Sequence, residues 1–91
     1  MTTWFASLAP DDQRDAIERL NTPQGRAALD YAGGGQANVA FAAFLAEADC
    51  LSFERYGLSI FDLPDYLWRD AYDNEMSPME ALADAITQAA S

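Results

Sequence analysis

The segment from Gln36 to Asp49 constrains the fold more than any other part of the sequence, because it is apolar almost all the way round. Its large side chains are separated by alanines, and they are Val39, Phe41, Phe44 and Leu45. A helix without a polar face has to be covered by its neighbours, and alanines allow those neighbours to approach closely. The sequence therefore predicts a central helix buried by other helices.

Helix-start signals divide the rest of the chain into short segments. Ser77-Pro78-Met79-Glu80 combines a capping serine, a proline suited to the first helical position and a glutamate that can bond back to the cap. Thr22-Pro23 is a second start, and Gly33-Gly34-Gly35 ends that helix because glycine has a high entropy cost in a helix. Together with Pro10-Asp11 and Asp62-Leu63-Pro64-Asp65, these signals predict helices over 10–20, 22–32, 62–75 and from 77 onwards.

The apolar residues of these segments recur at helical spacing, which predicts the sides that face the core. The predicted inward set is Ile17, Leu20, Leu63, Leu67, Trp68, Ala71, Tyr72, Met79, Leu82, Ile86 and Ala89. A further turn is expected over 52–56, before Gly57, and 58–61 is a short apolar connection. Since no hairpin signal or internal repeat is present, the chain is predicted to be one all-α domain over 1–91, a compact bundle of four to six short helices around the central apolar helix.

The charge of the chain restricts what it can bind. Fifteen Asp and Glu face five Arg, with no Lys and no His, which gives a formal charge of -10. Phosphate contacts need Lys or Arg to displace counterions, so we expect no direct binding to nucleic acid and none to an anionic membrane surface. A protein with a basic surface would instead be attracted and captured faster.

Two features indicate the compartment. The single cysteine, Cys50, excludes an internal disulfide, as is usual in the reducing cytoplasm. No base precedes Arg14, so a signal peptide is not expected, and the longest apolar run, Val39 to Ala46, is too short to cross a bilayer. The sequence predicts a cytoplasmic protein.

The sequence contains few residues that could act in catalysis or bind a metal ion. Without histidine the chain lacks the commonest general base and the commonest metal ligand, and its acids are predicted to lie along solvent faces. Asp70 to Glu75 has some acids of a calcium loop but lacks the turn glycine and the later glutamate. Gly33-Gly34-Gly35 is not followed by a phosphate-binding lysine. We therefore expect no enzymatic activity, metal or cofactor, and a structural role for Cys50.

The segment 62–75 is the best candidate for partner binding. Trp68 and Tyr72 are predicted to lie toward the edge of its apolar side, and tryptophan and tyrosine are enriched where proteins bind one another. Acidic residues surround them. The predicted partner-binding residues are Asp65, Trp68, Asp70, Tyr72, Asp73 and Glu75.

Four features of the chain resemble those of a known class of proteins. They are its small size, its acidity, the absence of histidine and lysine, and the acidic stretch Asp62-Leu63-Pro64-Asp65-Tyr66-Leu67-Trp68-Arg69-Asp70-Ala71-Tyr72-Asp73-Asn74-Glu75. The chain resembles the small acidic proteins encoded by phages and mobile elements, including anti-CRISPR and anti-restriction inhibitors that act as DNA mimics. The resemblance implies a stoichiometric inhibitor. It would bind a CRISPR effector or another DNA-handling protein and block a nucleic-acid channel or a subunit contact.

Two other interpretations remain open. The chain can instead be a cellular adaptor or antitoxin-like protein that pairs with its partner through apolar helix faces. The acidity can also be a solubility or halophile trait, because eighteen alanines and no lysine suggest a GC-rich genome. The oligomeric state also stays open between monomer and homodimer, since the central helix is more apolar than a chain of 91 residues easily covers.

Overall fold

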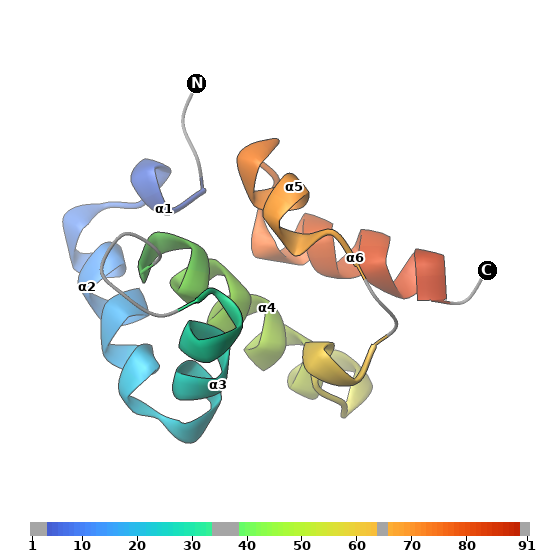
Figure 1. Ribbon diagram of the computed structural model, residues 1–91. Helices are drawn as coiled ribbons and strands as arrows, with labels where there is room; N and C mark the ends of the chain where they lie inside the picture. Colours follow the sequence, from blue (N-terminus) through green and yellow to red (C-terminus); the bar gives the residue numbers. More distant parts are fainter. Residues whose placement is uncertain (1–3, 34–38, 64–65, 90–91) are drawn as a thin grey trace.

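The computed structural model describes residues 4–33, 39–63 and 66–89, which form six α-helices and two 3₁₀ turns, with no strand among them (Figure 1). The helices are α1 (Trp4–Ser7), α2 (Pro10–Glu18), α3 (Pro23–Tyr31), α4 (Val39–Tyr56), α5 (Trp68–Asp73) and α6 (Pro78–Ala89). The turn η1 (Arg19–Asn21) joins α2 to α3, and η3 (Ile60–Asp62) lies between α4 and α5. The predicted all-α bundle is confirmed.

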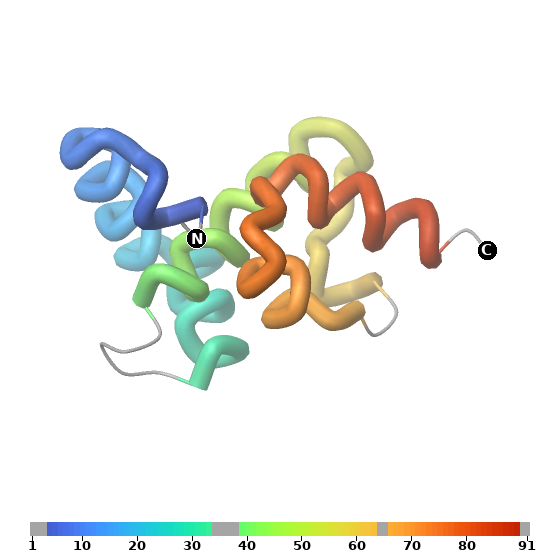
Figure 2. The backbone as a smooth tube through the Cα atoms, turned by 90° about the horizontal axis from the view of Figure 1, so that it is seen from above, coloured from blue at the N-terminus to red at the C-terminus, as the bar shows by residue number. Residues whose placement is uncertain are grey.

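Helix α4 is the centre of the bundle. Figures 1 and 2 show α1 to α3 on one side of it and α5 and α6 on the other. It is one continuous helix of 18 residues, so the turn predicted over 52–56 is present, but as the last part of α4 and not as an element that follows it. Nothing between Asp49 and Ser52 interrupts the helix, and it ends where Gly57 adopts a positive φ of 70°.

Aromatic rings join both sides of the bundle to α4. The ring of Phe44 lies 6.0 Å from that of Trp4 and 5.4 Å from that of Tyr72, both edge-on. Phe41 is 5.4 Å from Tyr72 as well. Small residues allow the close approach of the backbones, since Ala28 of α3 and Ala81 of α6 are fully buried against the same core.

Two predicted helix starts are confirmed in atomic detail. The Gly25 N–H donates to Thr22 Oγ1 at 3.0 Å, which caps α3. At α6 the Glu80 N–H donates to Ser77 Oγ at 3.2 Å, and the Ser77 N–H donates to the Glu80 carboxylate at 3.0 Å. That second bond, together with the serine hydroxyl, holds the pKa of Glu80 below its ordinary value.

The helix predicted over 62–75 is wrong in its N-terminal part. Asp62 ends η3, and α5 does not begin until Trp68. Leu63 is extended (φ -76°, ψ 155°), as expected of a residue that precedes proline and is forced out of the helical region. Pro64 and Asp65 lie outside the described residues.

The side that each helix buries also differs from the prediction at several positions. Ile17 is 44% exposed, because α2 turns the small Ala16 toward the core instead. Ala89 is exposed, while α6 buries Ala81, Leu82 and Ala85. In α2 a small residue thus occupies the contact for which the periodicity favoured a large one.

Asp49 is a buried acid, which contradicts the expectation that the acids lie along solvent faces. It lies in α4 and is only 2% exposed. Its Oδ1 accepts hydrogen bonds from Ser59 Oγ at 2.8 Å and from the Ile60 N–H at 2.9 Å. These bonds hold the loop after Gly57 against α4 and bring Ile60, which is 1% exposed, into the core.

Replacing Asp49 with alanine should therefore destabilise the fold more than replacing Ser59. Asp49→Ala leaves a buried N–H and a hydroxyl without their acceptor, and we expect a loss of about 2–3 kcal/mol in the free energy of unfolding. Ser59→Ala removes one of the two donors and should cost about 1 kcal/mol. Urea denaturation followed by circular dichroism measures both, and an Asp49→Ala variant as stable as the wild type would contradict the account of this loop.

Candidate protein-binding surface

The structure separates the predicted partner-binding residues into two groups. Asp70, Asp73 and Glu75 are exposed, whereas Trp68 and Tyr72 are only 3% and 8% exposed. Asp65 lies outside the described residues. The expectation that Trp68 and Tyr72 lie at an open edge is wrong.

The reason is that α5 is short and covered on more than one side. Its buried residues are Trp68, Ala71 and Tyr72, and the helix contacts both α4 and α6. The Trp68 ring meets that of Tyr66 edge-on at 4.7 Å, while Tyr72 packs against Phe41 and Phe44. Both residues belong to the core of the bundle.

Leu67 is the exposed apolar residue of this segment. It precedes α5 and is 72% exposed. Two grooves lie beside it, and both are lined by Leu67 and Tyr66. One groove, of about 190 Å³, lies between α5 and α6; the other, of about 470 Å³, lies between the start of α5, the end of α3 and the start of α4. We call the two grooves together the Leu67 surface: Tyr31, Ala32, Phe41, Tyr66, Leu67, Trp68, Arg69, Asp70, Ala71, Asn74, Met76, Asp84 and Gln88.

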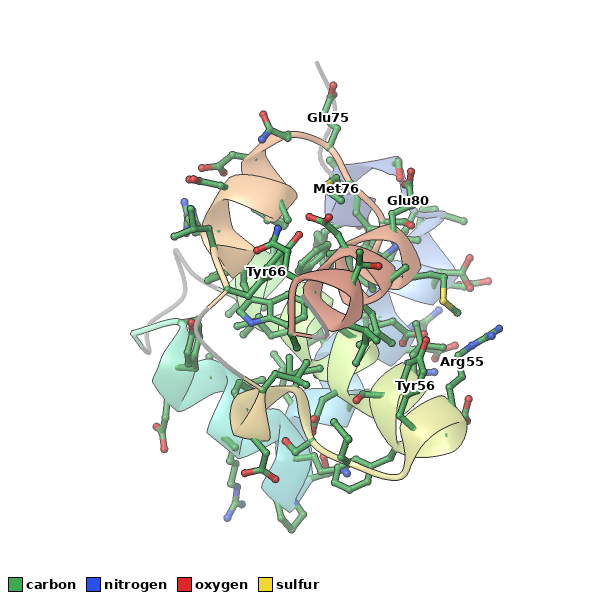
Figure 3. The ribbon with its side chains drawn as sticks, turned by 90° about the vertical axis from the view of Figure 1, so that its right-hand side faces the viewer. Arg55, Tyr56, Tyr66, Glu75, Met76 and Glu80 are labelled. Atoms are coloured by element: carbon green, nitrogen blue, oxygen red, sulfur yellow. The ribbon has the colours of Figure 1, made fainter. Side chains whose placement is uncertain are left out.

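On the α6 side, the surface has a polar rim held in place by hydrogen bonds. Tyr66 lies beside α6 (Figure 3), and its hydroxyl donates to Asp84 Oδ2 at 2.6 Å. Gln88 Nε2 donates to the same oxygen at 3.3 Å. Burial, together with the neighbouring carboxylate, raises the pKa of Tyr66 above its ordinary value of 10.0, so the phenol stays a donor at neutral pH. Asp70 lines the same groove and makes no ion pair with any described residue.

On the opposite side, Arg69 partly compensates the acidic charge. Its guanidinium lies over the rings of Phe41, at 5.1 Å, and Tyr72, at 5.8 Å. Its Nε is 3.5 Å from Asp73 Oδ1, one helical turn away. Asp73 lines neither groove, but it pairs with Arg69, which lines the larger one. Glu75 lines neither groove, and Figure 3 shows it at the turn after α5, pointing away from the bundle.

The described residues offer little to a metal ion or to nucleophilic catalysis. They contain no group of three His, Cys, Asp or Glu side chains placed to hold a metal. Cys50 is half-buried, with its Sγ 4.0 Å from Gln24 Oε1. None of the helices in the described part of the chain is long and apolar enough to cross a membrane.

No family model, no curated protein sequence and no solved structure matches this chain. The residues of the Leu67 surface and the charge of the chain are therefore the features of this protein that bear on its function.

The core position of Trp68 and the surface position of Leu67 can be separated by stability measurements. Trp68→Ala should cost about 3 kcal/mol or more, because it removes a large buried ring. Leu67→Ser changes an exposed side chain and should alter the free energy of unfolding by less than about 0.5 kcal/mol. Urea denaturation of both variants tests this, and equal losses would contradict the assignment of Leu67 to an open surface.

Proposed function

We propose that this protein binds a basic protein partner through the Leu67 surface. The observation that carries the proposal is the exposure of Leu67 between two grooves. Tyr31, which is 54% exposed, borders the larger of them, so two of the five large hydrophobic residues that are exposed among the described residues gather on one surface. An exposed apolar patch with a polar rim is typical of a protein–protein interaction site.

The charge of the polar rim favours a basic partner. Asp70 and Asp84 add carboxylates on one side, and the single base of the surface, Arg69, is paired with Asp73. The formal charge of -10 extends this attraction beyond the contact itself. A partner with lysines or arginines around an apolar anchor would match both properties.

The proposed partner is a nucleic-acid-binding protein, and the proposed activity is inhibition. A basic surface that attracts phosphates also attracts carboxylates, so an acidic protein can occupy it in place of nucleic acid. The resemblance to phage and mobile-element inhibitors of the anti-CRISPR type supports this choice. A CRISPR effector is one such partner.

A second candidate is an adaptor or antitoxin-like protein that pairs through apolar helix faces. Phe53 and Tyr56 favour it, because both are exposed large hydrophobic residues outside the Leu67 surface. Figure 3 shows Tyr56 beside Arg55 at the C-terminal end of α4. An adaptor would make its main contacts at this end of α4, and the acidic residues would contribute little to its binding free energy.

Photo-cross-linking can decide between the two surfaces. A photoreactive phenylalanine analogue placed at Leu67 or at Phe53 gives two variants with matched exposed apolar positions. We expect the Leu67 variant to capture a basic protein from the native host, and purified partner to lose nucleic-acid binding when our protein is added. Capture only from Phe53, or a partner that still binds nucleic acid normally, would contradict the proposal.

Charge reversal tests the acidic rim. The variant Asp70→Lys should bind the captured partner about five- to tenfold more weakly, mainly through a slower association rate. Glu18→Lys is the matched control, since it makes the same change in net charge at an exposed acid that lines neither groove. Surface plasmon resonance measures both rates. Equal losses in the two variants would show that net charge, and not this surface, governs binding.

A further inference from the structure

A separate groove lies on another part of the bundle, between α1, α2, the middle of α4 and the start of α6. Its volume is about 450 Å³, and none of its residues belongs to the Leu67 surface. Its large apolar side chains are all half-buried, and they are Trp4, Leu8, Leu51 and Met79. We call it the Trp4 groove.

The apolar side of the groove is fixed by packing. The Trp4 ring lies edge-on to Phe44 at 6.0 Å, which ties α1 to the core of α4. Met79 follows Pro78 in the first turn of α6, where the bonds between Ser77 and Glu80 cap the helix. The groove is therefore formed before any ligand arrives, and an occupant need not order it.

The remaining side of the groove carries uncompensated negative charge. Asp12 and Asp15 lie in α2, are exposed, and make no ion pair with a described residue. The one base of the groove, Arg19, is paired with Glu47 of α4. Asp12 and Asp15 thus lie beside an apolar floor without an ion-pair partner among the described residues.

We propose that the Trp4 groove docks a short segment of a partner protein in which apolar side chains alternate with arginine or lysine. The apolar side chains would cover Trp4, Leu51 and Met79, and the basic ones would pair with Asp12 and Asp15. A chain segment fits better than a small molecule, because small-molecule sites bury most of their ligand, whereas Asp12 and Asp15 are exposed to solvent. The site is independent of the Leu67 surface.

Three capped hexapeptides probe the groove: one of alternating leucine and arginine, one of leucine and glutamate, and one of glycine and arginine. In two-dimensional NMR of the labelled protein, we expect the leucine–arginine peptide to cause saturable shifts at the Trp4 indole N–H and at the Leu51 and Met79 amides. The other two peptides should cause at least about tenfold weaker shifts, since each lacks one of the required properties. The Asp12→Asn, Asp15→Asn variant should weaken binding about five- to tenfold, as expected for two solvent-exposed ion pairs.

The matched control is Asp11→Asn, Glu18→Asn, which removes the same charge from the same helix at exposed residues outside the groove. This variant should bind like the wild type. Equal binding of the glycine–arginine peptide, equal losses in the two variants, or shifts confined to the Leu67 surface would overturn the proposal. Because the readout is local to Trp4, its failure is distinguishable from a failure of the function proposed for the Leu67 surface.

Discussion

The burial of α4 is the constraint on which the rest of the structure depends. Nine of its 18 residues are buried, and most of those nine are alanine, phenylalanine or leucine. Because none of the residues 39–52 is exposed, the other described helices all pack against this part of the bundle, and each of them contacts α4. One consequence is that nearly all acids are displaced to the outside, and the high charge density of the surface follows from the fold as well as from the composition.

Local features of the fold could be predicted from the sequence, because their physics is contained in a few neighbouring residues. The side chains of Ser77 and Glu80 each accept a hydrogen bond from the other residue's backbone N–H. The Thr22 hydroxyl accepts one from the Gly25 N–H. The central position of α4 was also predictable, since a helix that is apolar all round has only one stable location. These predictions needed no knowledge of distant contacts.

The candidate site was harder to predict, because burial depends on which elements cover a helix. Periodicity places Trp68 and Tyr72 near the edge of an apolar side, but α4 and α6 both reach α5 and enclose that edge. Leu67 lies just before the helix begins, so helical spacing does not apply to it. Asp49 resembled the other acids in sequence, and its donors, at Ser59 and Ile60, lie beyond the end of α4.

The central claim is that the surface acids capture a basic partner and do not serve solubility alone. The dissociation constant of the complex with the purified cross-linked partner, measured over a series of sodium chloride concentrations, tests it most directly. The account predicts that affinity falls by about tenfold or more between low and physiological ionic strength, mainly through a slower association rate, because salt screens charges over about 8–10 Å. An affinity and association rate that stay constant over the series would contradict it, and would favour an adaptor that binds through apolar helix faces.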